Sequence, residues 1–149
     1  MFLKKLSVFK ENLPAIKEHK LVPLLVPHAS HASEAVAVTA LRLLYNLSFE
    51  KASREAMLNG PMLPRVVQLL KKKQQLPLVL RILYNLTVEE KSRAIIAKSD
   101  VPAALRKQLM SFNEQMLPAE MAGLAINLAT NPVAAEAMCE GSAVPCSSY

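Results

Sequence analysis

A ten-residue segment occurs three times along the chain, at intervals of about forty residues. It reads LRLLYNLSFE at 41–50, LRILYNLTVE at 80–89 and, less closely, AGLAINLATN at 122–131. The asparagines at its centre are separated by 39 and 42 residues. A period in this range predicts stacked supersecondary units, each of which buries its apolar face against its neighbours.

The first copy, with the residues before it, has the apolar spacing of an amphipathic helix. Positions i, i+4, i+7, i+8 and i+11 share one face of an α-helix. Here these positions are Val36, Ala40, Leu43, Leu44 and Leu47. We therefore expect this face to form the core of each unit.

Polar residues of the same segment fall on a second face of the helix. Arg42 and Asn46 are four residues apart, so they are neighbours on the helix surface. Arg81 and Asn85 repeat this pair, and Asn127 holds the asparagine position in the third copy. Stacking would place these five residues in a row, which we call the polar ladder.

Composition favours an all-α fold. Residues of the hydrophobic class make up 52% of the chain and charged residues 20%, and there are only three glycines against ten prolines. These values are typical of a globular helical chain whose breaks are made mainly by proline. We expect one solenoid with units at about 13–49, 50–89 and 90–131, and with partial units at 1–12 and 132–149.

Each unit is expected to contain two shorter helices and one long third helix. The expected helices are 13–20, 23–26 and 34–48, then 50–60, 64–73 and 76–88, then 90–98, 102–111 and 117–129, and finally 132–140. Residues 27–33 are expected to be a loop. Pro64, Pro77 and Pro118 suit helix starts, where a missing N–H costs no intrahelical bond, and Gly60 suits a helix stop.

The two ends of the chain are expected to be incomplete units. Residues 2–12 match the end of a third helix, and Pro145 would open a second helix that four further residues cannot complete. A solenoid normally covers its end units with polar faces. We therefore expect a fragment whose terminal units leave apolar surface exposed.

The formal charge of +6 and the pI near 9.5 favour acidic partners. Seven aromatic residues, no Trp and no nucleic-acid-binding signature argue against a nucleic-acid-binding protein. The N-terminal residues include basic side chains but no apolar h-region, so no signal peptide is expected, and no later apolar run reaches the roughly 18 residues needed to span a bilayer. We expect an intracellular protein with reduced thiols at Cys139 and Cys146, while a bridge between these two cysteines is the alternative that nothing in the sequence favours.

No pattern in the sequence indicates catalysis or a cofactor. His28 and His31 lie far from the two cysteines, and no zinc-binding spacing is present, so no metal site is expected. A phosphate-binding glycine loop, a nucleophile elbow and a catalytic carboxylate pair are also missing. The chain is therefore expected not to be an enzyme.

Three-helix units of about forty residues, with a proline near the second helix and a third helix that ends in N-L-S, N-L-T or N-L-A, resemble armadillo repeats. Within that superfamily the runs FLKKLSVFKEN, LRLLYNLSFE, AINLATN and MCEG resemble the kinesin-associated protein family, the non-motor subunits of heterotrimeric kinesin-2. The resemblance implies a right-handed armadillo superhelix that binds the motor chains and cargo adaptors. It also implies a place in the cytoplasm, on the cytoskeleton and in the cilium, with a role in intraflagellar transport.

An armadillo-type nuclear-import receptor is the alternative function. Such receptors grip basic peptides with Trp and Asn on the third helix, whereas Arg42, Arg81 and Gly123 occupy the Trp positions here. A basic groove would repel such cargo, so this alternative ranks second.

The polar ladder is the predicted partner-binding groove. Asn amides both donate and accept, so they suit the main chain of an extended peptide, and arginines would select acidic segments. An alternative interpretation is that each Asn only ties its helix end to a neighbouring loop.

Overall fold

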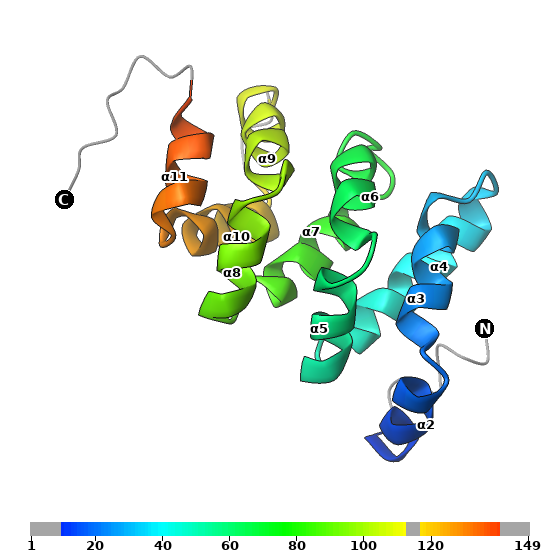
Figure 1. The fold of residues 1–149 in the computed structure, drawn as a ribbon. Coiled ribbons are helices and arrows are strands. Elements are labelled where there is room, and N and C mark those ends of the chain that lie inside the picture. The colour runs from blue at the N-terminus through cyan, green and yellow to red at the C-terminus, as the bar shows by residue number, and fades with distance from the viewer. Residues whose placement is uncertain (1–9, 113–116, 141–149) are drawn as a thin grey trace.

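The computed structural model describes residues 10–112 and 117–140, and every regular element in them is a helix (Figure 1). The elements are η1 (Lys10–Asn12), α2 (Leu13–Glu18), α3 (Leu21–Leu25), η2 (Val26–Ser30), α4 (Glu34–Leu47), α5 (Lys51–Leu58), α6 (Met62–Leu69), α7 (Leu76–Leu86), α8 (Glu90–Ala97), α9 (Val101–Met110), α10 (Ala119–Ala129) and α11 (Pro132–Cys139). The prediction of an all-α chain is confirmed.

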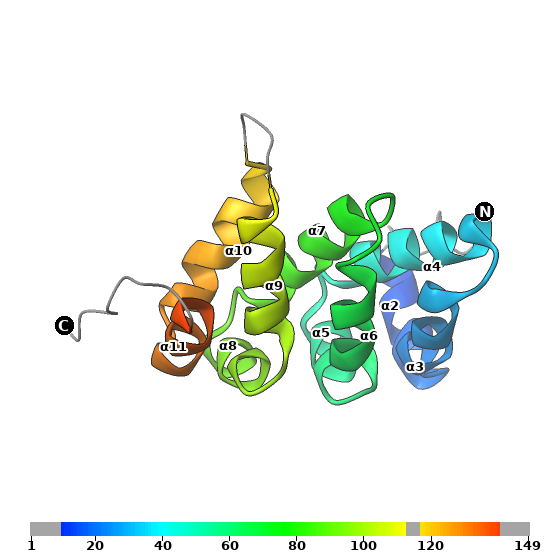
Figure 2. The ribbon, with the colours of Figure 1, turned by 90° about the horizontal axis from the view of Figure 1, so that it is seen from above.

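The helices pack in rows that run along the molecule. The long helices α4, α7 and α10 pack one on the next, as do α5, α8 and α11, and α6 packs on α9. Figure 2 shows α4, α7 and α10 along one side and α3, α5 and α8 along the other. The architecture is an all-α solenoid of the armadillo type. The surface therefore has two sides. We call the side formed by α4, α7 and α10 the third-helix face, and the side formed by α3, α5 and α8 the opposite face.

The core follows the row of third helices. Its largest fully buried side chains include Leu41, Leu44, Leu47, Leu80, Ile82, Leu83 and Leu86. Val36 was expected among them but is 39% exposed, while Ala37 is completely buried. Ala37, Leu41 and Leu44 define the middle of the buried face, and Val36 is turned about 100° from Ala37. The first turn of α4 is thus buried over a narrower arc than its middle.

Prolines mark most helix starts, as expected, but one lies deeper than predicted. Pro77 and Pro102 are in the first two positions of their helices, and Pro118 is the N-cap of α10. Pro64 is the third residue of α6 because that helix already begins at Met62. It is tolerated there because the first four N–H groups of a helix have no intrahelical partner. Gly60 directly follows Asn59, the C-cap of α5, and so occupies the position at which glycine commonly ends a helix, as expected.

The predicted loop at 27–33 is mostly helical. Val26–Ser30 forms the 3-10 helix η2, which continues directly from α3 and packs against both α4 and α6. Pro27 is the second residue of η2, where the N–H groups of a helix have no partner within it, so its missing N–H costs no bond of η2. Together α3 and η2 form the second helix of their unit, the position that α9 has in the third unit. Only residues 31–33 connect them to α4.

The helix α2 is the least anchored element of the N-terminal region. It buries no side chain completely, and it packs on η1 and α3. Lys20 joins it to α3 in a left-handed conformation, with φ 47° and ψ 46°. A non-glycine residue in this region carries a conformational cost. The helix direction therefore changes sharply at Lys20.

Cys139 corrects one expectation. It lies at the end of α11 and is disulfide-bonded in the structure, so the prediction of a reduced thiol is wrong for this residue. Cys146, the chain's other cysteine, is outside the described residues. Across residues 10–112 and 117–140, no helix is long and apolar enough to cross a membrane.

We expect amide hydrogen exchange to be slowest in α4 around 43–47 and in α7 around 82–86. These segments are buried and have a neighbouring third helix, whereas α2 buries no residue. Units in a solenoid are stabilised mainly by neighbours, so protection should fall toward both ends. Exchange measured by mass spectrometry or NMR tests this. Protection at Ala135 and Met138 equal to that at Leu83 would contradict it.

Candidate partner-binding face

The five residues of the polar ladder lie on the third-helix face. Arg42 and Asn46 come from α4, Arg81 and Asn85 from α7, and Asn127 from α10. Both arginines are exposed and the three asparagines are half-buried. Since α4, α7 and α10 pack consecutively, the structure brings the five residues onto one continuous surface.

Two of the asparagines bond the end of the preceding third helix. The Asn85 amide donates from Nδ2 to Oγ of Ser48 over 2.8 Å, and Asn127 donates to Oγ1 of Thr87 over 3.1 Å. Ser48 and Thr87 are the C-cap residues of α4 and α7. Each hydroxyl in turn donates to the main-chain oxygen three residues before it. A chain of hydrogen bonds thus links each helix end to the next unit.

These contacts use one donor of each amide group for a structural purpose. The alternative interpretation of the sequence is that each asparagine ties its own helix end to a neighbouring loop. The observed bonds have such a structural role, but they join the asparagine to the helix end of the preceding unit. Ser48 and Thr87 are fully buried, so an unsatisfied hydroxyl there would be costly. Binding of a partner peptide by Asn85 and Asn127 stays a prediction. It would have to use the amide oxygen and the second N–H of each side chain.

The two arginines of the ladder have different surroundings. Arg81 donates from Nε to Oε1 of Glu120 over 2.9 Å, and their side chains are 47% and 34% exposed. A hydrogen bond from its own main-chain N–H, followed by the one from Arg81, holds the pKa of Glu120 below its ordinary value. Arg42 has no ion pair among the residues that the structure describes. The positive charge available to a partner is therefore greatest at Arg42.

Glu120 was not identified from the sequence. It follows Arg81 by 39 residues, which is close to the repeat length, but it lies in the first turn of α10 rather than at the arginine position. The feature of the sequence that could have identified the pair was an acidic residue at an expected helix start, one repeat after an exposed arginine. Pairs between units are harder to recognise than pairs within one helix.

Exposed apolar side chains accompany the ladder, and sequence reasoning missed them too. Phe49 is 63% exposed, Tyr84 42%, Val88 58% and Ile126 67%. Tyr45 packs edge-on against Phe49 with ring centroids 5.1 Å apart. We call these five residues the apolar strip. The signal was present, because Tyr45, Tyr84 and Ile126 each precede a ladder asparagine.

Gly123 sets the approach of α10 to Tyr84. A Cβ atom at Gly123 would lie 3.0 Å from Cε2 and 3.3 Å from Cδ2 of Tyr84. The side chain of Tyr84 would have to shift to admit even a methyl group. Glycine at this third-helix position therefore makes room for the tyrosine ring of the preceding unit.

A second polar contact stabilises the ends of the third helices. Arg54 donates from Nη1 to the main-chain oxygens of Ser48 (3.2 Å) and Phe49 (3.0 Å). Arg93 makes the same pair of bonds to Thr87 and Val88, each 2.9 Å long. Carbonyl groups at a helix C-terminus lack intrahelical partners, and a cation there also suits the helix dipole. The recurring arginine therefore caps the third helices α4 and α7.

Arg54 also bridges two units. Its Nη2 lies 2.6 Å from Oε1 of Glu89, and Lys51 lies 3.7 Å from the other oxygen of the same carboxylate. The hydrogen bond from Arg54 holds the pKa of Glu89 below its ordinary value, with a further contribution from the charge of Lys51.

Glu50, which lies one repeat before Glu89, makes a different contact. Its carboxylate caps α5 by accepting from the N–H of Ser53 over 2.6 Å. Partial burial raises the pKa of Glu50, but hydrogen bonds from the main chain of Ser53 and Ala52 outweigh this and leave it below its ordinary value. The same repeat position thus serves one helix cap and one bridge between units.

Among the described residues, no group of three or more His, Cys, Asp or Glu side chains could hold a metal ion. The third-helix face presents exposed cations, amide groups and apolar side chains on a row of packed helices. These features define the class of protein as an armadillo-type repeat scaffold.

The comparison with family models identifies the family. The model described as "Kinesin-associated protein (KAP)" matches residues 1–146. The chain belongs to the kinesin-associated protein family, and this gives it the general role of a kinesin-associated scaffold. No curated protein matches the chain significantly.

We expect Asn85→Ala to lower the free energy of unfolding by about 1 kcal/mol, because it removes the donor to the buried Ser48 hydroxyl. Ser48→Ala removes the acceptor. If the two residues interact directly, the double variant should lose less than the sum of the single losses. Urea denaturation followed by circular dichroism measures all four free energies. Strict additivity would contradict the bond as drawn.

The pKa of Glu89 predicts a loss of stability in acid. Its pKa is lower in the folded chain than its ordinary 4.5, so its stabilising effect is present above 4.5 and disappears as the pH falls through the folded value. Glu89→Gln should therefore reduce the fall in unfolding free energy between about pH 7 and about pH 3. Glu136→Gln, at an exposed glutamate of α11, is the control and should leave that fall unchanged. Equal effects of the two variants would refute the prediction.

Proposed function

We propose that this chain is a non-catalytic adaptor of the kinesin-2 motor complex. It binds the motor chains and links them to cargo adaptors for microtubule-based, intraflagellar transport. The observation that carries the proposal is the family match over residues 1–146. The protein would accordingly act in the cytoplasm, on the cytoskeleton and in the cilium.

The third-helix face is the proposed binding surface for an extended acidic segment. Arg42 supplies an exposed cation without an ion pair in the described part of the chain, and Arg81 can exchange Glu120 for a partner carboxylate. Asn46, Asn85 and Asn127 supply one amide group from each of the three stacked helices. Guanidinium groups pair with carboxylates through two parallel hydrogen bonds, which accounts for the preference for acidic segments.

The apolar strip supports a partner segment that is not purely acidic. Phe49, Tyr84, Val88 and Ile126 are exposed next to the polar ladder. Partner interfaces combine large apolar or aromatic anchors with a polar rim. A motor-chain segment with alternating acidic and apolar side chains would satisfy both sets of residues.

The Arg81–Glu120 pair permits a sharp test of the face. Arg42→Glu should weaken binding of purified kinesin-2 motor chains about tenfold, or about 1.4 kcal/mol, without changing the melting temperature. Arg81→Glu alone places two carboxylates together, whereas Arg81→Glu with Glu120→Arg restores a pair in reverse. The reversed pair should keep the stability but not the affinity.

Lys91→Glu provides the matched control, since Lys91 is exposed on α8 and the change in charge is the same. It should bind as the unchanged protein does. Surface plasmon resonance against immobilised motor chains gives the affinities. Intact binding by Arg42→Glu and by the reversed pair would end the proposed face, and absence of any motor-chain binding by the unchanged protein would end the proposed function.

The nuclear-import alternative makes the opposite prediction about charge. It requires affinity for basic peptides, which the exposed Arg42 would oppose. A titration with a lysine-rich peptide and one with a glutamate-rich peptide on the same surface decides between the two. A nucleic-acid-binding protein would instead bind an oligonucleotide with strong salt dependence.

A further inference from the structure

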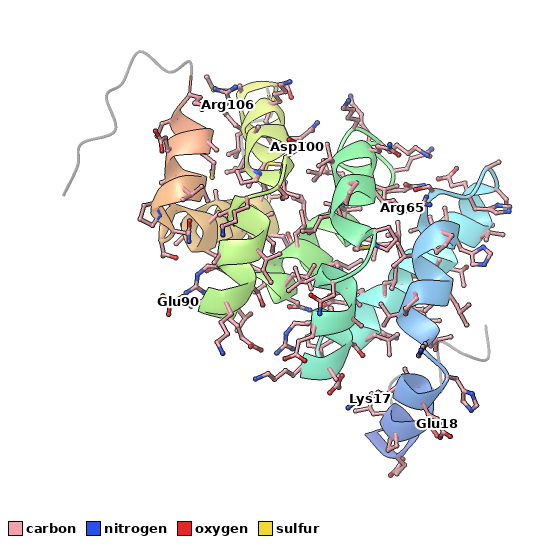
Figure 3. The ribbon with its side chains drawn as sticks, in the orientation of Figure 1. Lys17, Glu18, Arg65, Glu90, Asp100 and Arg106 are labelled. Atoms are coloured by element: carbon pink, nitrogen blue, oxygen red, sulfur yellow. The ribbon has the colours of Figure 1, made fainter. Side chains whose placement is uncertain are left out.

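A cleft of about 340 Å³ opens between the N-terminal helices and α5. Ala52, Ala56 and Gly60 form one wall of it, and Ile16, Leu21 and Val22 contribute apolar surface from α2 and α3. Lys17 and Lys20 also line the cleft and are exposed. In Figure 3, Lys17 points from α2 toward the side of α5, while Glu18 points the other way.

The cleft exists because the wall from α5 has only small side chains. Ala52, Ala56 and Gly60 are spaced at i, i+4 and i+8, so they follow one side of the helix and its end. One repeat later the same positions are occupied by Lys91, Ile95 and Ser99. The small residues are therefore particular to the junction next to α2 and are not a general property of the repeat.

The opposite wall also leaves apolar surface uncovered. Ile16 and Leu21 are only half-buried, and α2 buries no side chain completely. The left-handed Lys20 turns the chain between α2 and α3, which keeps α2 from continuing the line of α3. Apolar atoms on both walls would lose contact with water if a further apolar group entered the cleft.

The charge at the cleft has one sign. Lys17 and Lys20 form no ion pair with any described residue. The residues of α5 and of the turn after it that line the cleft are Ala52, Ser53, Ala56, Asn59 and Gly60, and none of them is charged. The ammonium groups are therefore available to anionic groups at the edge of the cleft.

We propose that this cleft binds a short segment of a partner protein in which two apolar side chains are flanked by aspartate or glutamate. The apolar side chains enter between Ala56 and Leu21, and the carboxylates pair with Lys17 and Lys20. The volume is near the lower limit of about 300–1,000 Å³ for ligand sites, so it admits side chains rather than a whole helix. The apolar walls make a free inorganic anion a poor ligand.

This site is separate from the proposed groove. Figure 2 places α3 and α5 on the side away from α4, α7 and α10. A segment in the cleft would leave the third-helix face open, so the scaffold could hold two partner segments at once. The inference does not depend on the identity of the motor chains.

A fluorescein-labelled peptide that has a Leu-Leu pair between two Glu-Glu pairs is the probe, and fluorescence anisotropy measures its binding. Ala56→Leu fills the cleft and should weaken binding at least about tenfold. Ala103→Leu is the matched control, because it adds the same side chain to the separate cleft between α6 and α9. It should change the affinity less than about twofold.

The lysines are tested by Lys17→Glu with Lys20→Glu, which should weaken binding about tenfold and abolish its salt dependence. Lys91→Glu is the control for charge. Both lysines are exposed, so their substitution should not unfold the chain. The lysine variant therefore still tests the proposal if Ala56→Leu loses helicity. The proposal is overturned if the probe does not bind saturably, if the lysine variant binds normally, or if Ala103→Leu weakens binding as much as a folded Ala56→Leu.

Discussion

Burial of the third helices against one another is the constraint on which the structure depends. Leu44, Leu83 and Leu124 are all completely buried, although each unit is too small to cover such side chains alone. Each third helix therefore needs a neighbour, and the helices stack in a row. At roughly 25 cal/mol for each Å² of apolar surface removed from water, this burial is the main stabilising contribution. It also fixes which residues can face a partner, since only the outward side of the row stays free.

Apolar contact alone would not fix the register of one unit on the next. The bonds from Asn85 to Ser48 and from Asn127 to Thr87 provide directional contacts between successive third helices, and the ion pair of Arg54 with Glu89 links α5 to the start of α8. Misaligned units would lose these bonds, each worth about 0.5–1.5 kcal/mol, although each hydroxyl would keep its own bond to the main chain. The polar ladder thus helps to align the units. A partner can bind only to the ladder atoms that are not already bonded within the chain.

The fold could be predicted from the sequence because its strongest signals are long and periodic. The third helix expected at 34–48 is observed at Glu34–Leu47, and the one expected at 76–88 is observed at Leu76–Leu86. Shorter elements were harder: Pro27 indicated a loop, but a 3-10 helix tolerates its missing N–H. The partners of Asn85 and Arg81 were not predictable, because they lie 37 and 39 residues away and depend on how the units meet.

The two faces of the solenoid differ in how far their charged groups are already paired, and this affects what each can recognise. On the third-helix face, a partner carboxylate that approaches Arg81 must compete with Glu120, which is charged at neutral pH and whose pKa is held below its ordinary value by its own main-chain N–H and, next, by the bond from Arg81. Competition of this kind reduces the gain from each new ion pair and increases the importance of the exposed Phe49 and Ile126. At the cleft beside α5, Lys17 and Lys20 have no ion-pair competitor within the described residues. Charge should therefore contribute less to recognition at Arg81 than at Arg42 or at the two lysines of the cleft.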